Sequence, residues 1–384
     1  MRGKPDSEPP MFFAICVEDR VRPEHPLRPV KRMVDEELSR MSRRFALAYA
    51  DTGRPSVPPE RLLKALLLQS LYSVRSENQL CERIDTDLLF RWFLDMDPAE
   101  PMFDATAFTH NRPRLEQHGL IAVFFEGVVK RAMRAGLTSD DHFSVDGTLI
   151  ESYASIKSYA SIKSFVPKDR KDDGDHNGYK SRNPEVNFHG QQRGNATHIS
   201  TTDSEARLYK KAEGQPAKLY HMGHALTENR HGLVMAVVVS EANGQAEPAA
   251  AIEMLDHVRR RHRVVPKTAG SDKGYDSGPY YRELEQRGVT PHSAMRAGPV
   301  GGATRRKKKH LPLIQVRQRM ARRLRTTGYR LSQRCRKKIE EAFGWIKTVA
   351  GMCRTRLVGR WNIKQQLQIA AAAYNLVRIR KLAT

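Results

Sequence analysis

The chain lacks the features that mark membrane-spanning and disulfide-stabilised proteins. No stretch approaches the ~20 consecutive apolar residues that cross a bilayer, so we expect no membrane partner. The first apolar run, residues 11–17, is too short for a secretory leader and is followed directly by Glu18 and Asp19. The four cysteines show no C-x-x-C spacing, which favours free thiols in a reducing cytoplasm over a zinc site or a disulfide framework.

Acidic residues are scarce in the last fifth of the chain. Residues 301–384 hold 23 lysines and arginines against two acids, Glu340 and Glu341, whereas the preceding 300 residues carry 43 basic and 41 acidic side chains. Nearly all of the net charge of +23 therefore lies in this basic segment. A polyphosphate partner explains such a segment better than an anionic membrane surface or a merely solvated tail. Apolar residues at helical spacing, with Trp345 and Trp361, indicate that it folds. The composition predicts a nucleic-acid partner.

Helical spacing of apolar residues dominates the first third of the chain. Residues 1–35 are polar and proline-rich and predict an N-terminal arm, and residues 36–136 predict a compact all-helical domain. One of its helices opens at Pro58 and Pro59, and Ser76 has the capping-box spacing to Gln79. Short helices joined by tight turns are compatible with a helix-turn-helix DNA-binding domain and equally with a plain helical bundle. The near-neutral charge of the region does not favour DNA binding.

From residue 137 onward the pattern predicts strands alternating with helices. Strands are expected at 143–150, 217–228, 233–241, 267–272 and 289–294, and helices at 247–261 and 279–287. This succession predicts a mixed α/β fold in which helices flank a mixed sheet. The basic segment 301–384 is expected to start extended and to continue as helices at 333–352 and 363–382.

A duplication interrupts this pattern. The six residues 152–157 recur unchanged at 158–163, and two copies are too few for a repeat architecture. The polar residues 164–192 that follow predict a mobile loop. We interpret the duplication as an insertion in a connection that tolerates it.

Three acidic residues on different predicted elements stand out. Asp146 lies within a predicted buried strand, where a carboxylate is costly unless it is paired, hydrogen-bonded or bound to a metal. For an isolated Asp-Gly pair, however, a turn-capping role is the simpler explanation. Asp272 also ends a strand beside a glycine-bearing turn. Glu340 shares one helix face with Arg336 and Lys347, which alone would indicate only a surface ion pair. Together the carboxylates, one of them embedded in polycation, favour a metal-dependent phosphodiester site, because Mg²⁺ and Mn²⁺ prefer oxygen ligands.

Five motifs extend this pattern over nearly the whole chain, from about residue 25 to residue 382. They are Val-Asp-Gly-Thr-Leu-Ile-Glu at 145–151, Asn-Ala-Thr-His at 195–198, Gly-His-Ala-Leu-Thr-Glu-Asn-Arg at 223–230, Asp-Lys-Gly-Tyr at 272–275 and Ile-Glu-Glu-Ala-Phe-Gly-Trp-Ile-Lys at 339–347. With these motifs the sequence resembles bacterial insertion-sequence transposases of the DDE class, specifically the insertion-sequence-five family.

The resemblance implies an RNase H-like catalytic domain over residues 137–384, in which Asp146, Asp272 and Glu340 are catalytic and bind two divalent ions, Mg²⁺ or Mn²⁺. The last motif of the family reads Y-x2-R-x3-E-x6-K. Arg336, Glu340 and Lys347 match it, which selects Glu340 over Glu341. Gln333 departs from it by occupying the tyrosine position, and this puts the positioning of the DNA end in question.

The implied function is that of a DNA transposase, which cleaves at the terminal inverted repeats of an element and transfers the 3′-OH ends into target DNA. Double-stranded DNA is then the partner, and a homodimer is expected because two ends must be paired. The expected DNA contacts are Arg336, Lys347, Arg305, Arg306, Lys307, Arg356 and Arg360. Two alternatives stay open: a nuclease on the same core without strand transfer, and a non-catalytic DNA-binding protein.

Structural roles are the simpler interpretation for several other side chains near these motifs. The alternative for each histidine is metal ligation, and for each acid it is an indirect role in the site. For each tryptophan the alternative is stacking on a base. The residues concerned are His198, His224, Asp276, Glu151, Trp345 and Trp361.

Overall fold

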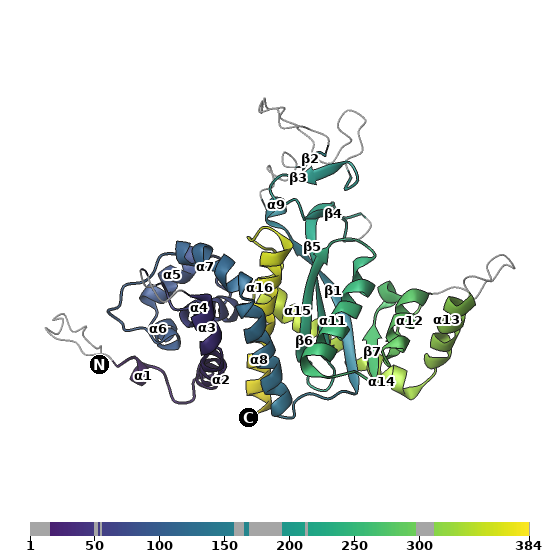
Figure 1. Ribbon diagram of the computed structural model, residues 1–384, viewed down its shortest axis with the longest axis horizontal. Helices are drawn as coiled ribbons and strands as arrows, with labels where there is room; N and C mark the ends of the chain where they lie inside the picture. Colours follow the sequence, from purple (N-terminus) through teal and green to yellow (C-terminus); the bar gives the residue numbers. More distant parts are fainter. Residues whose placement is uncertain are drawn as a thin grey trace, which may run out of the picture. The chain divides into compact units, whose positions relative to one another are not determined.

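The computed structural model of the chain describes residues 16–49, 53, 56–156, 165–168, 194–211, 214–296 and 311–383 (Figure 1). The second copy of the duplication and the loop expected over 164–192 lie almost entirely outside these ranges. The same holds for Arg305, Arg306 and Lys307. No helix in the described part is long and apolar enough to cross a membrane.

The chain divides into two compact units. The first comprises Met1–Gln69 and Val74–His118, and the second comprises Ser70–Ser73 and Gly119–Thr384. The helical region expected over 36–136 is therefore divided at His118, because the helix that follows belongs to the second unit.

The first unit is built from helices. They are α1 (Val17–Arg20), α2 (Leu27–Arg40), α3 (Ser42–Ala48), α4 (Pro59–Leu71), α5 (Glu77–Thr86), α6 (Leu88–Leu94) and α7 (Thr106–Gln117). Burial of apolar faces stabilises them, and Leu62, Phe90 and Phe93 are 0% exposed. The expected cap is present: the Ser76 hydroxyl accepts a hydrogen bond from the backbone N–H of Gln79 at 3.2 Å. Part of the 1–35 stretch expected as an arm is helical, since α2 begins at Leu27.

The second unit contains the sheet. Its first elements are α8 (Leu120–Arg134), β1 (His142–Glu151), α9 (Tyr153–Ile156), β2 (Phe165–Pro167), β3 (His198–Ser200), β4 (Arg207–Tyr209), β5 (Lys218–Glu228) and β6 (Val234–Glu241). They are followed by α11 (Ala246–His262), β7 (Thr268–Ser271), a 3₁₀ turn (Lys273–Tyr275), α12 (Gly278–Gln286), β8 (Thr290–Ser293), α13 (Leu311–Arg323), α14 (Thr327–Cys335), α15 (Lys337–Thr348) and α16 (Arg360–Leu382).

Strand pairing in this sheet confirms the expected mixed α/β class. β1 pairs antiparallel with β5, and β5 pairs antiparallel with β6 to form the expected hairpin. On its other side β1 pairs in parallel with β7, which pairs in parallel with β8. The order β6-β5-β1-β7-β8, three antiparallel strands and then two parallel ones, is the RNase H-like arrangement. β4 extends the sheet beside β5, and β2 and β3 form a separate pair.

Helices α11 and α16 pack on the sheet, and α8 packs on α16. α16 packs on α8 and on β6, and α11 packs on β5, β6 and β1 (Figure 1). Asn375 of α16 is 0% exposed, and its side-chain amide bonds the backbone N–H and C=O of Val234 at 2.9 and 2.8 Å. These contacts fix the C-terminal helix to β6 and so give β1 a rigid support.

The helix expected over residues 333–352 is two helices. α14 ends at Cys335 and α15 begins at Lys337, with Arg336 at the junction. Near the end of α14, the side-chain amide of Gln333 donates to the carbonyl of Ser271 at 3.3 Å and to that of His292. α14 is thereby attached to the ends of β7 and β8.

Candidate active site

Asp146 lies on the central strand β1 with its side chain 18% exposed. One carboxylate oxygen, Oδ1, accepts a hydrogen bond from the backbone N–H of Gly147 at 2.9 Å, and the other, Oδ2, lies 3.3 Å from Nη1 of Arg336. Burial raises the pKa of Asp146 to about 6, against the lowering effects of Gly147 and Arg336, and the charges of Asp272 and Glu340 raise it further. The site thus holds a carboxylate whose charge the fold only partly compensates.

Asp272 directly follows β7, the parallel neighbour of β1. Its Oδ1 accepts a hydrogen bond from the backbone N–H of Gly274 at 2.7 Å, which begins the 3₁₀ turn Lys273–Tyr275. The parallel register of β1 and β7 pairs Ser144 with Gly270, so Asp146 and Asp272, each two residues further along, come close enough for the charge of Asp272 to act on Asp146.

Glu340 lies in the first turn of α15, and its side chain is 58% exposed. Its Oε1 is 3.3 Å from Nη2 of Arg336, whose Nη1 contacts Asp146. The guanidinium of Arg336 therefore lies between Asp146 and Glu340 as a shared cation. Glu341 faces elsewhere, 3.9 Å from Nη1 of Arg378.

Sequence reasoning missed a further carboxylate, that of Glu247 in the first turn of α11. A Cβ placed on Gly147 would lie 2.8 Å from Glu247 Oε1, and one placed on Gly274 would lie 2.7 Å from Oε2. Burial raises the pKa of Glu247 to about 7, with added contributions from the charges of Asp272 and Asp146. No local signal marked it, because an acid in a first helical turn is a common partner of the helix dipole.

These carboxylates do not form a preassembled cage. Across the described ranges, no group of three or more histidine, cysteine, aspartate or glutamate side chains stands ready to hold a metal ion. Arg336 explains this locally, since it lies between two of the predicted ligands. The exposed side chain of Glu340 can exchange this contact for another without disturbing the core.

Lys347 and Gln333 occupy the remaining motif positions. Lys347 is half-buried, and its pKa is lowered mainly by burial and further by the charge of Lys211, while Asp146 acts in the opposite direction. Gln333 points toward the ends of β7 and β8 through the bonds described above.

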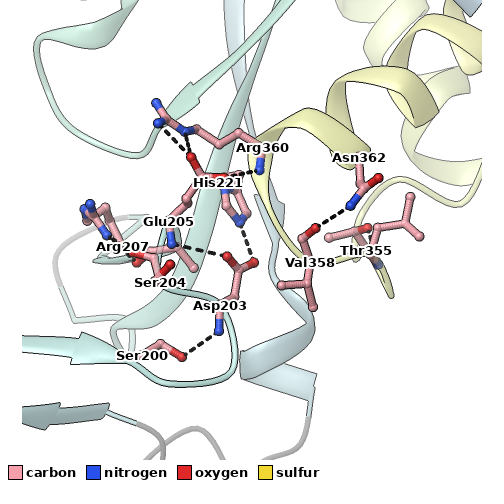
Figure 2. A network of polar contacts seen from close by, with 12 residues as sticks. Ser200, Asp203, Ser204, Glu205, Arg207, His221, Thr355, Val358, Arg360 and Asn362 are labelled. Atoms are coloured by element: carbon pink, nitrogen blue, oxygen red, sulfur yellow. Dashed lines mark hydrogen bonds and ion pairs between the residues drawn. The ribbon is translucent and has the colours of Figure 1, made fainter. Parts of the chain in front are cut away.

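Arg360 and Arg356 differ in their surroundings. Arg360 belongs to a polar network that joins the loop before α16 to the segment between β3 and β4 (Figure 2). Its backbone N–H and its Nε donate to Glu205 at 2.7 and 2.8 Å, and nearby His221 contacts Asp203 at 2.8 Å. Arg356 is exposed.

The histidines and acids considered as alternatives have structural surroundings. The His198 ring stacks on Phe165 with ring centres 5.3 Å apart. The carboxylate of Asp276 accepts hydrogen bonds from the Tyr281 hydroxyl at 2.9 Å and from Arg317 at 2.8 Å. The carboxylate oxygens of Glu151 contact the side chains of Lys218 and Arg354.

His224 and the two tryptophans occupy different environments. His224 is 0% exposed, its Nε2 lies 2.7 Å from the Ser240 hydroxyl, and burial lowers its pKa to about 4. Trp345 packs against Tyr374 with ring centres 5.8 Å apart, while Trp361 is 49% exposed.

Comparison with known proteins identifies the class. The family model "Transposase domain (DUF772)" matches residues 15–114, and "Transposase DDE domain" matches residues 195–376. The second match begins after β1, so it includes Asp272 and Glu340 but not Asp146. The matched regions account for most of the chain and fall on the two structural units. The chain is therefore a DNA transposase, and it belongs to the insertion-sequence transposases of the DDE type.

Comparison with solved structures and curated proteins adds little. The Mos1 transposase paired-end complex with the left transposon end is 14% identical over 82% of this chain and 87% of that chain, with a TM-score of 0.20. The mariner Mos1 paired-end complex with Mn is 14% identical over 83% and 86%, with a TM-score of 0.19. Similarity at this level supports no structural argument. No curated protein sequence matches the chain.

Proposed function

We propose that this transposase belongs to the insertion-sequence-five family, cleaves DNA at the terminal inverted repeats of its element and joins the freed 3′-OH ends to target DNA. One observation supports the proposal: Arg336 contacts both Asp146 on β1 and Glu340 on α15, and the charges of Glu340 and of Asp272, which follows the parallel neighbour β7, both act on Asp146. Paired aspartates and a glutamate on these elements are the residue types that metal-dependent phosphodiester chemistry requires.

The chemistry of the residues suits divalent cations. All three side chains supply oxygen donors, which Mg²⁺ and Mn²⁺ prefer. Burial is the main cause of the raised pKa of Asp146, the charges of Asp272 and Glu340 raise it further, and a nearby positive charge would offset these effects. We assign two cations, Mg²⁺ or Mn²⁺, to Asp146, Asp272 and Glu340.

Bound there, the cations would supply Lewis-acid polarisation of the phosphodiester and lower the pKa of the attacking water. The protein contributes orientation and charge. Asp146 is held by the backbone N–H of Gly147 and Asp272 by that of Gly274, so their second oxygens keep a defined direction. Arg336 and Lys347 provide positive charge for the DNA phosphates once Arg336 leaves the carboxylates.

Other DNA contacts follow from charge and exposure. Arg356 is available at the surface, whereas Arg360 must first release Glu205. Arg305, Arg306 and Lys307 are assigned to DNA from their sequence alone. The helical first unit is assigned to DNA binding because short helices joined by tight turns suit such a domain, and a homodimer is assigned because two ends must be paired.

The test combines purified protein, an element-end duplex and Mg²⁺. Asp146→Asn and Glu340→Gln should abolish cleavage, whereas Glu341→Gln is the matched control on the adjacent residue and should retain it. Unchanged cleavage by either site variant would overturn the assignment. A plasmid-joining assay distinguishes a transposase from a nuclease on the same core, because only the transposase joins the cleaved ends to another DNA. If the protein binds DNA equally well with and without a chelator and yields no cleaved product, a non-catalytic binding protein is favoured.

A further inference from the structure

Glu247 lies against two glycines of the proposed active site, Gly147 in β1 and Gly274 in the 3₁₀ turn. Its two carboxylate oxygens face different glycines, Oε1 toward Gly147 and Oε2 toward Gly274. The backbone N–H groups of these glycines hold Asp146 and Asp272. One carboxylate from α11 is thus placed beside the segments that carry both aspartates.

The distances leave room for one ion between Glu247 and Asp272. The Cβ position of Gly274 lies 2.7 Å from Glu247 Oε2 and 3.0 Å from Asp272 Oδ1, so these two oxygens are at most 5.7 Å apart. Two oxygens that share one Mg²⁺ at about 2.1 Å are at most about 4.2 Å apart. A rotation of the glutamate side chain covers the difference.

Two buried polar atoms beside Glu247 point independently to a missing ligand. The Nδ1 atom of His224 lies 3.3 Å from the Cβ position of Gly147, on the side of Glu247, and it has no hydrogen-bond partner among the described residues. The hydroxyl of Tyr275, on which the charge of Glu247 acts, also lacks one there. Both side chains are 0% exposed, and a buried polar atom without a partner is costly. A hydrated cation at Glu247 would supply partners for both.

We propose that Glu247 is a fourth carboxylate of the active site and serves, together with Asp272, as an oxygen ligand for a divalent cation. The inference rests on the proposed function. It also explains the two glycines, because a side chain at either position would displace the Glu247 carboxylate.

Binding of Mn²⁺ alone to the full chain, measured by isothermal titration calorimetry, tests the assignment without any cleavage assay. Glu247→Gln keeps the size of the side chain and should weaken Mn²⁺ binding about tenfold or more, or remove one binding event. Glu253→Gln on the same helix is the matched control, since Glu253 is exposed, and should bind like the wild type.

The outcomes separate this inference from the proposed function. If the wild type binds no Mn²⁺, the proposed function itself fails. If Asp146→Asn loses Mn²⁺ binding while Glu247→Gln binds as the wild type does, only the role of Glu247 is refuted.

A second measurement covers the case in which Glu247→Gln does not fold. Replacing a strand glycine by alanine is ordinarily neutral or stabilising where the backbone permits it. Gly147→Ala should instead lower the melting temperature of the wild type more than that of Glu247→Ala, because the nearest contact of the new Cβ, 2.8 Å to Oε1, requires the glutamate, whereas Nδ1 of His224 at 3.3 Å remains in both backgrounds. An equal effect of Gly147→Ala in both backgrounds would contradict the placement of Glu247.

Discussion

The charge of Asp146 should destabilise the fold at neutral pH, and Asp146→Asn measures by how much. Burial raises the pKa of this carboxyl from 3.8 to about 6, a difference that corresponds to ~3 kcal/mol once the group is ionised. Because the side chain is still 18% exposed, we expect a gain of ~1–3 kcal/mol from the substitution. Asparagine keeps Oδ1 as the acceptor for Gly147 N–H, so little else is lost.

The sign of the effect depends on pH. The folded-state pKa lies above the unfolded-state value, so the penalty is absent below about pH 4 and complete above about pH 7. The asparagine variant should therefore unfold ~2–10 °C above the wild type at pH 8, with the difference shrinking to zero as the pH falls to about 4.

Differential scanning calorimetry checks the expected pH dependence of the melting temperature. Both proteins are measured in the presence of a chelator, at steps between about pH 4 and pH 8. Glu341→Gln is the control, since that side chain is 61% exposed and should change the melting temperature little at any pH. A destabilised Asp146→Asn variant, or a gain that does not vary with pH, would refute the burial argument.

Further expectations concern the packing of the sheet and the binding of DNA. Asn375→Leu should cost ~2–4 kcal/mol in urea unfolding, because it leaves the buried N–H and C=O of Val234 without partners. Gly223→Ala should lower the free energy of unfolding by ~1–3 kcal/mol, because the new Cβ would lie 2.9 Å from Ile150 Cδ1 and 3.3 Å from Leu367 Cδ2. Adding Ile150→Val, which removes Cδ1, should restore part of that loss. The affinity for an element-end duplex should fall steeply between about 50 and 200 mM salt, because an interface with several phosphate contacts releases counterions. Fluorescence anisotropy measures this affinity, and an affinity that does not change with salt would argue against such contacts.

Much of the catalytic unit was predictable because its signals are local. The hairpin of β5 and β6, the helix α11 and the strand before Asp272 follow from periodicity and turn residues, and all three are present. The N-terminal arm was a harder case. α2 buries Val30, Val34 and Leu38 at helical spacing. The prolines before and within its first turn, however, favoured the prediction of an irregular arm, although proline is also common in the first turn of a helix.

Long-range contacts account for what the sequence did not reveal. The break between α14 and α15 at Arg336 accompanies bonds from Gln333 and Arg336 to strands far away in the chain. Glu247 is close to Asp146 and Asp272 only because α11 packs against β1 and the 3₁₀ turn, and no spacing along the chain records that contact. Periodicity identifies elements, whereas the assembly of a site from four of them depends on their packing.

The structure also decides between two interpretations of Asp146. From sequence, a turn-capping aspartate and a metal-binding aspartate are alternatives. In the fold Asp146 caps no turn, because Gly147 continues β1; Oδ1 of Asp146 accepts the N–H of Gly147 while Oδ2 faces Arg336. Of the two aspartates it is Asp272 that caps a turn, through its Oδ1 and the N–H of Gly274. At both positions the glycine that donates the bond leaves space for the carboxylate of Glu247. The backbone bond that orients each aspartate therefore comes from a residue whose missing side chain admits another acid.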